Sequence, residues 1–430
     1  MHKSKQNRFA GFIVAMVLLF PGLLSFAQDE KKVDLEFYGF VRVDAYMDTY
    51  KGQDLGHDIF YLLPQLSKVG NVEINDQLSS NISAMASRLG ARIKGPDVLN
   101  AKLTGALEFD FAGNLRTDPT MFRIRQAFTM LTWEKSSLLM GQTWHPFFGG
   151  ANMPIVAGLN TGAPFHAFNR SPMISYKYKM NSLLIGLAAV TENQYATSMA
   201  VSPSLYMNSG NHAKRNGVLP ELVFTADWSK EGKLFAGAGA EYKRIKPLMV
   251  LQNGAGDYFK ADEFLTSTGF VGYLRYKGSK FTMLAKGFYG QNLSHLVMPG
   301  GYGVATYDAA TGKETYTNYT HFTALISAVY GKEFQVGIFA AYGQNLGTSD
   351  PLFDAGDGKA KTYGLFLPVQ DMMRIAPHIA YNKGKLRFVA ELENTSANYG
   401  QGAINLSDGL YSAVANATNN RLIFTMTHYF

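Results

Sequence analysis

The chain has 430 residues, including 43 Gly, 24 Tyr, 30 Phe and no Cys, and its mean hydropathy is −0.08. The absence of cysteine excludes a disulfide scaffold and any thiolate metal site. The net charge of +7 is spread along the chain, so it does not indicate nucleic-acid binding, and no nucleic-acid partner is expected.

A secretory signal peptide is predicted at residues 1–27. Basic residues precede an apolar run from Phe9 to Phe26, and Ala27 ends a small-residue cleavage site. The alternative is an uncleaved membrane anchor. It is disfavoured because the run is barely long enough to span a bilayer and no basic segment follows it. Residues 28–430 are then expected to form a single domain.

Segments that alternate apolar and polar residues fill the rest of the chain. In the first, 33–48, every second residue from Leu35 to Met47 is apolar or small, while charges and tyrosines occupy the other face. A period of two with one apolar and one polar face indicates a strand between lipid and water. The same alternation recurs at 88–94, 102–111, 123–133, 138–144, 174–180, 183–191, 222–228, 234–244, 270–276, 281–289, 319–330, 334–343, 373–381, 386–392 and 421–430.

The connections between these segments alternate in length. Short polar turns such as Asn181-Ser182 alternate with long stretches such as 145–170 and 292–318. This alternation distinguishes an outer-membrane barrel from a soluble sandwich. The sequence therefore predicts an all-β fold, a transmembrane antiparallel β-barrel of about 16 strands with short periplasmic turns and long external loops. Its expected location is the bacterial outer membrane, in contact with lipid and lipopolysaccharide.

The last predicted strand ends on Phe430, on the face that is apolar in this segment. We expect this strand to pair with the one at 35–47, because an unpaired strand edge is not tolerated in a bilayer. The ending resembles the C-terminal strand of bacterial outer-membrane barrels. That resemblance implies that Phe430 acts as an assembly signal for the barrel-assembly machinery.

Four segments carry a narrower resemblance. They are Gly39-Phe-Val-Arg-Val-Asp44, Ser87-Arg-Leu-Gly90, Phe122-Arg-Ile-Arg-Gln-Ala127 and Leu138-Leu-Met-Gly-Gln-Thr-Trp144. They resemble recurring segments of the DcaP-like porins, and the whole chain after residue 27 is similar to trimeric diffusion porins. The resemblance implies a homotrimer that passes small hydrophilic solutes by passive diffusion, without a cofactor.

The long connection at 145–170 is the candidate constriction loop. It contains no Asp or Glu but several large apolar residues, which indicates packing against the inner wall of the barrel. In porins the third external loop folds inward in this way. The alternative is a loop that packs on a neighbouring subunit or on its own neighbours. The candidate residues within it are Phe147, Phe148, His166 and Arg170.

The lumen wall opposite this loop is predicted to be basic. If the polar faces point inward, the early strands bring in the candidate pore-lining residues Arg42, Arg88, Arg92, Lys102, Arg123, Arg125, Glu108 and Asp110. Fixed guanidinium groups favour carboxylate and phosphate over cations, so a weak preference for anions is expected. Arg123 and Arg125 are the best candidates, as a short basic ladder. The alternative is that the charges are wall-lining ion pairs that neutralise one another.

Other function classes remain open. An outer-membrane lipase or protease would need a nucleophile with a base, but the chain has no Gly-x-Ser-x-Gly motif. A non-conducting structural or adhesive barrel is also possible, although about sixteen strands leave an aqueous channel. His145 and His166 bracket the 145–170 loop, but two histidines without a third ligand do not predict a metal site. We therefore expect neither catalysis nor a bound metal.

Overall fold

The computed structural model describes residues 33–54, 59–113, 122–149, 152–197 and 221–430. The signal peptide predicted at 1–27 lies outside these residues. Within the described part of the chain, no helix has both the length and the apolar character needed to cross a bilayer.

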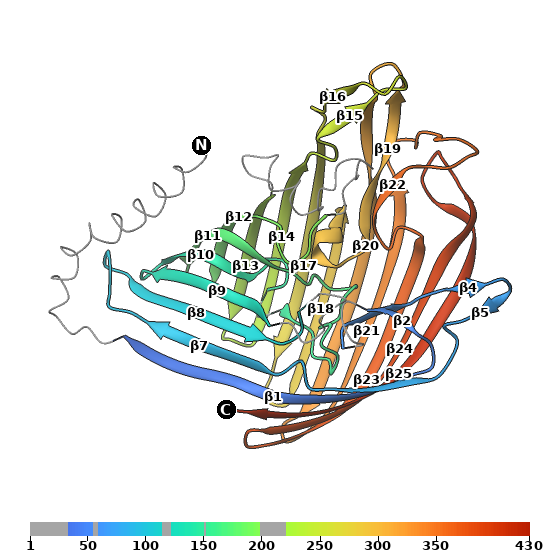
Figure 1. Ribbon diagram of the computed structural model, residues 1–430. Coiled ribbons are helices and arrows are strands. Elements are labelled where there is room, and N and C mark those ends of the chain that lie inside the picture. The colour runs from blue at the N-terminus through green and yellow to red at the C-terminus, as the bar shows by residue number, and fades with distance from the viewer. Residues whose placement is uncertain (1–32, 55–58, 114–121, 150–151, 198–220) are drawn as a thin grey trace, which may run out of the picture.

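The fold is an antiparallel sheet that closes into a barrel (Figure 1). Of its nineteen strands, three extend the sheet beyond the wall, and the other sixteen form the wall. The wall strands of the first half are β1 (Asp34–Asp48), β7 (Arg88–Lys94), β8 (Lys102–Asp110), β9 (Arg123–Thr132), β10 (Ser136–Trp144), β11 (Arg170–Met180), β12 (Leu183–Val190) and β13 (Glu221–Lys230). Those of the second half are β14 (Leu234–Ile245), β17 (Leu265–Lys277), β18 (Phe281–Gln291), β20 (Lys313–Gly331), β21 (Phe334–Thr348), β23 (Val369–Lys383), β24 (Leu386–Ile404) and β25 (Tyr411–Tyr429). The predicted count and class of strands are confirmed.

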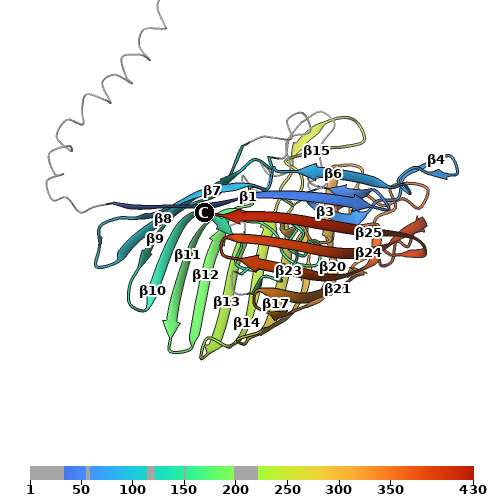
Figure 2. The same ribbon diagram turned by 90° about the horizontal axis from the view of Figure 1, so that it is seen from below.

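The barrel closes where β1 meets β25. The two strands pair from Phe40 opposite Tyr429 to Asp48 opposite Arg421, and they lie side by side in Figure 2. The Phe430 amide continues the ladder by donating to the Gly39 carbonyl at 3.2 Å. The pairing expected from the sequence between the first and last strands is therefore confirmed, and no edge strand remains in the wall.

The outward faces of the strands form an apolar belt. On β1 the exposed side chains include Leu35, Phe37 and Val41, and on β25 they include Phe424 and Met426. On β25 the neighbours of Phe424 and Met426 are buried inside the barrel, and on β1 the buried positions Asp44, Tyr46 and Asp48 alternate with less buried ones, as the period of two requires. Exposed apolar side chains outside a polar interior are the arrangement of a barrel surrounded by lipid.

Further strands lie beyond the wall. β6 (Ser79–Ser83), β19 (Gly300–Asp308) and β22 (Thr362–Leu365) extend the main sheet. Three small hairpins are formed by β2 (Gly52–Asp54) with β3 (Tyr61–Pro64), β4 (Lys68–Val69) with β5 (Val72–Glu73), and β15 (Val250–Gln252) with β16 (Tyr258–Lys260). The sequence predicts a loop over 292–318, but this stretch holds β19, the start of β20 and the short helix η3 (Leu293–Leu296). Alternation fails to predict β19 because both Tyr302 and its neighbours Gly301 and Gly303 are buried.

The interior of the barrel contains folded loops. The stretch 145–170, hereafter the inward loop, contributes Phe148, Phe165 and Phe168 to the largest apolar cluster, and Leu62 of β3 joins them. The same cluster includes Phe339 and other residues of the opposite wall. Loops and inner wall therefore share one core, which fixes the loops in place.

Candidate functional site

The inward loop crosses the lumen and is bound to the far wall. The Ile155 amide donates to Ser327 Oγ of β20 at 3.0 Å, and the Ala157 amide donates to the Glu391 carboxylate of β24 at 2.8 Å. Arg374 Nη1 on β23 donates to the Ala163 carbonyl at 2.9 Å. These bonds satisfy buried polar groups of the loop backbone, which would otherwise be costly inside the barrel.

The aromatic residues of the inward loop are buried. Phe147 and Phe148 are 1% and 2% exposed, and His166 is fully buried. Lys286 of β18 donates to the Phe147 carbonyl at 2.7 Å, and its Nζ lies 3.1 Å from His166 Nε2. Burial and the neighbouring Lys286 hold the pKa of His166 well below its usual range, so this imidazole is neutral.

The wall beside the loop carries arginines that are paired with carboxylates. Arg123 binds Asp110 through two bonds of 2.6 and 3.0 Å. Arg125 bridges Glu108 at 2.8 Å and Asp110 at 2.7 Å, and Arg88 Nε lies 3.7 Å from Glu108. The arginines that the sequence predicts as a basic ladder are thus members of an ion-pair network, because strand β8 places its carboxylates beside β9.

Two further arginines complete this wall. Arg42 donates to Asp44 at 2.7 Å and also to the Ala157 carbonyl of the inward loop at 2.6 Å. Arg170, at the start of β11, stacks its guanidinium 4.6 Å from the centre of the Trp144 ring. Its Nε donates to Gln194 at 2.8 Å, but Nη1 and Nη2 have no hydrogen-bond partner among the described residues. We call Arg42, Arg88, Arg123, Arg125 and Arg170 the arginine cluster.

A cavity of about 230 Å³ lies between the wall and the inward loop. Arg42, Arg88, Arg123 and Arg125 border it, and Val156 and other residues of the inward loop are also among its lining residues. Six of the predicted pore-lining positions therefore lie at or next to this cavity, namely Arg42, Arg88, Arg123, Arg125, Asp110 and, through its ion pairs, Glu108.

Two predicted residues lie apart from this cavity. Arg92 of β7 pairs with Glu36 at 3.0 Å, and both side chains are about half exposed. Lys102 is the exposed first residue of β8, next to the connection from β7. Both lie nearer the opposite end of their strands than Arg88 and Asp110 do, so neither borders the constriction between loop and wall.

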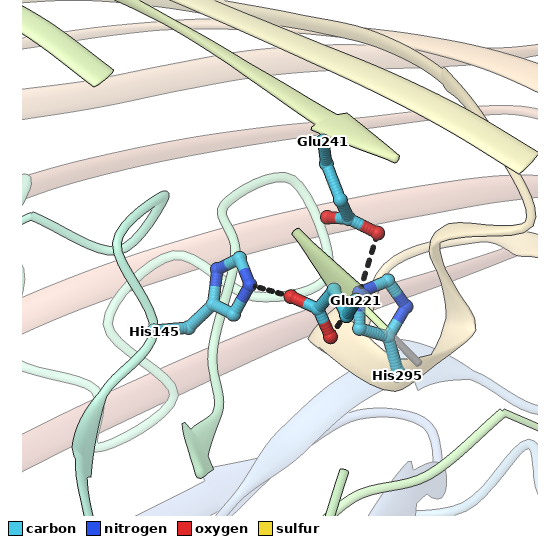
Figure 3. A group of neighbouring side chains, drawn as sticks. All are labelled: His145, Glu221, Glu241 and His295. Atoms are coloured by element: carbon cyan, nitrogen blue, oxygen red, sulfur yellow. Dashed lines mark hydrogen bonds and ion pairs between the residues drawn. The ribbon is translucent and has the colours of Figure 1, made fainter. Parts of the chain in front are cut away.

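The sequence does not predict one buried cluster of polar side chains. His145, Glu221, Glu241 and His295 come from the end of β10, β13, β14 and η3, and they converge within the barrel (Figure 3). They are far apart in the sequence and each one alone resembles an ordinary polar residue of a strand end or loop. Only the closure of the barrel and the inward course of the loops bring them together.

Comparison with known proteins supports the fold. No family model and no curated protein sequence matches the chain. Among solved structures, the outer membrane channel DcaP of Acinetobacter baumannii matches with a TM-score of 0.65 and 17% identity, covering 93% of this chain and 97% of that one. OmpT of Vibrio cholerae, folded in vitro and in trimer form, matches with a TM-score of 0.51 and 12% identity over 93% and 99% of the two chains. The anion-selective porin from Comamonas acidovorans matches with a TM-score of 0.51 and 12% identity, covering 93% of this chain and 100% of that one.

These structures share the overall fold of the chain. At such low identities the match concerns the fold, and it agrees with the lipid-facing belt of the wall. The chain therefore has the sixteen-stranded barrel fold of the outer-membrane porins and channels of Gram-negative bacteria.

Proposed function

We propose that this protein is a passive diffusion channel for small hydrophilic solutes, with no catalytic step. The observation that carries the proposal is the cavity between the arginine-bearing wall and the inward loop. A loop that is bound to the far wall by Glu391 and Arg374 narrows the lumen without filling it. Such a constriction selects solutes by size and charge, while the wide barrel around it stays wet.

We further propose that the channel favours anions such as carboxylates. Four guanidinium groups of the arginine cluster, those of Arg42, Arg88, Arg123 and Arg125, form ion pairs with three carboxylates, those of Asp44, Glu108 and Asp110. The fifth, that of Arg170, forms no ion pair among the described residues. Two positive charges are therefore in excess. Arg170 is fully buried and does not border the cavity, so it contributes through its charge. The guanidinium groups of Arg42, Arg88, Arg123 and Arg125 border the cavity, and a planar guanidinium suits a carboxylate, which accepts two bonds side by side.

We also propose that the protein assembles as a homotrimer in the outer membrane. The wall has a low side, where strands β7 to β12 have 7 to 11 residues, and a high side, where β20, β24 and β25 have 19 each. A transmembrane strand needs about 9 to 11 residues, so the low side barely spans the hydrocarbon layer. Packing against neighbouring copies would cover it, while the high side faces lipid and lipopolysaccharide. Insertion would require the barrel-assembly machinery, with Phe430 as its signal.

Planar-bilayer recording of the purified protein tests the channel and its selectivity. A salt gradient across the bilayer should give stepwise conductance and a reversal potential of the sign expected for anion flow. Absence of conductance would refute the channel. A cation-selective reversal potential would refute only the anion preference. An esterase and peptidase assay of the folded protein provides the complementary test, because turnover sensitive to serine inhibitors would favour the enzyme alternative.

A further inference from the structure

We propose that the buried cluster of His145, Glu221, Glu241 and His295 is a binding site for one divalent transition-metal cation of the zinc class. The proposal is independent of the solute that the channel carries. It rests on the chemistry of the donor atoms, on their separation, on buried oxygens without partners, and on the charge of the surroundings.

The four residues offer two imidazole nitrogens and two carboxylate oxygens from four separate elements (Figure 3). All four are at most 4% exposed. Mixed nitrogen and carboxylate donors in a set of four are typical of Zn²⁺ and its neighbours among the transition metals. Ca²⁺ and Mg²⁺ prefer six or more oxygen donors, which the cluster does not offer.

The donor atoms have nearly the spacing that a tetrahedral ion needs. Bonds of 2.0–2.2 Å to nitrogen and oxygen place ligand atoms about 3.4 Å apart. The candidate atoms all lie within 4.8 Å of one another. His295 Nε2 lies 3.0 Å from Glu241 Oε1 and 3.8 Å from Glu221 Oε2, which brackets this spacing. His145 Nε2 contacts Glu221 Oε1 directly, so an entering cation would have to separate that pair.

Two carboxylate oxygens in the cluster are buried without a hydrogen bond. Glu221 Oε2 and Glu241 Oε2 have no hydrogen-bond partner among the described residues. Buried carboxylates normally accept bonds at both oxygens, since an unsatisfied acceptor in a dry site is costly. Both side chains point into the cluster (Figure 3), where a cation would satisfy them.

The charges around the cluster also favour the binding of a cation. Besides Glu221 and Glu241, the buried Glu192 carboxylate lies 3.7 Å from Lys243, whose Nζ lies 2.8 Å from His295 Nδ1. Among these groups, one ammonium against three carboxylates leaves an excess of two negative charges. A single divalent cation balances this excess.

Lys243 would respond to the metal. Its Nζ lies 2.8 Å from His295 Nδ1 and donates to the Asn292 carbonyl at 2.7 Å. When Nε2 of a neutral imidazole binds a metal, Nδ1 carries the proton and ceases to be an acceptor. Lys243 would then turn from His295 towards the Glu192 carboxylate. The metal would also connect the start of the inward loop to η3 and the β13–β14 hairpin.

The test uses the full folded protein in detergent, stripped with a chelator and dialysed against Zn²⁺. Elemental analysis should give about one zinc per chain, and Co²⁺ should show the intense visible absorption of a four-coordinate site. Glu221→Gln and Glu241→Gln should each weaken Zn²⁺ affinity at least tenfold. His378→Asn is the matched control, because His378 lies 3.6 Å from Glu391 in another buried His–Glu pair and should retain full binding.

Two results would overturn the proposal. One is a correctly folded wild-type protein that binds neither Zn²⁺ nor Co²⁺. The other is zinc binding that survives both glutamine substitutions. If a glutamine variant does not fold, His295→Gln replaces it, and the Co²⁺ spectrum of the wild type still decides whether a four-coordinate site exists. Heat-dependent migration in gels verifies folding for each variant.

Discussion

Ala157 and Glu391 lie 234 positions apart in the chain, yet the Ala157 amide donates a 2.8 Å hydrogen bond to the Glu391 carboxylate. The next amide, of Gly158, donates to the same carboxylate at 3.3 Å. One side chain of β24 thus holds the tip of the inward loop across the lumen. These bonds fix the loop firmly, because a buried amide left without an acceptor is costly.

Glu391→Ala should therefore release part of the inward loop. The expected loss of stability is about 1–3 kcal/mol, because two buried amides lose their acceptor. Single-channel conductance should rise and become noisier, and the midpoint of thermal unfolding should fall. Glu333→Ala is the control, since Glu333 makes an exposed ion pair with Lys383. Unchanged conductance and unfolding in Glu391→Ala would contradict this role.

The ion-pair network should set the direction of selectivity changes. Arg125→Ala removes a positive charge and leaves Glu108 and Asp110 with fewer partners, so the reversal potential should shift towards cations. Asp110→Asn should shift it towards anions. One charge about 8 Å from a passing ion in a watery lumen changes its barrier by roughly 0.5 kcal/mol, or about twofold in rate.

Arg92→Ala serves as the control for selectivity. Arg92 is 53% exposed, pairs with Glu36 and does not border the cavity, so its loss should leave the reversal potential unchanged. Shifts of the same sign in Arg125→Ala and Asp110→Asn would show that the network does not govern ion passage.

His166 should make the packing of the inward loop sensitive to acid. Its pKa is lowered in the folded state, by burial and then by Lys286, so the unfolded chain binds more protons below its ordinary pKa of about 6.5. The stabilisation is present above that pH and is lost as the pH falls below it, at up to about 1.4 kcal/mol per pH unit. Thermal unfolding at pH 7.5 and 5.0 measures this loss. His166→Gln should reduce the difference between the two pH values, and an equal difference in both proteins would exclude His166.

Removal of Phe430 should impair closure of the barrel. Its amide bonds to Gly39, and its ring packs so closely that a Cβ at position 39 would lie 2.6 Å from it. The ring is 48% exposed, so its packing contributes on the order of 1 kcal/mol. The larger effect should be a reduced amount of folded protein in the outer membrane. Phe430→Tyr should preserve that amount; equal levels after deletion would argue against an assembly signal.

Leu187→Arg should dissociate the proposed trimer. Leu187 is 55% exposed on β12, which has only 8 residues, and it lies on the low side of the wall. Val336→Arg on β21 is the matched control, because Val336 is 64% exposed on a strand of 15 residues on the high side. Both changes should cost some stability in lipid. Light scattering should give monomers only for Leu187→Arg, and a trimer in both variants would place the interface elsewhere.

The alternation of apolar and polar residues predicts the parts of the strands that lie in the membrane. The terminal strand is predicted from 421, yet β25 begins at Tyr411, because the stretch from 411 to 420 is polar or small on both faces. A strand that extends beyond the bilayer has water on both sides, so its sequence carries no period of two. For the same reason, the alternation does not predict the second part of β24, which continues to Ile404.

The burial of the inward loop can be expected from its composition, but the ion-pair partners of the arginines on the neighbouring wall cannot. A long segment without carboxylates and with many aromatic residues indicates burial, and Phe147 and Phe148 are buried. Whether Arg123 faces a carboxylate depends on the register between β8 and β9, which places it opposite Asp110. That register includes a bulge near Glu108, which has no signature in the sequence.

The pairing of β1 with β25 also constrains when the barrel can fold. Phe40 and Tyr429 lie far apart in the sequence, so the wall cannot be completed before all the strands between them have been synthesised and exported. Until then the hydrogen-bonding edge of β1 has no permanent partner. Joining such distant segments carries a large entropic cost and makes folding slow. Each newly exported copy must therefore remain unfolded and protected from aggregation during its passage through the periplasm.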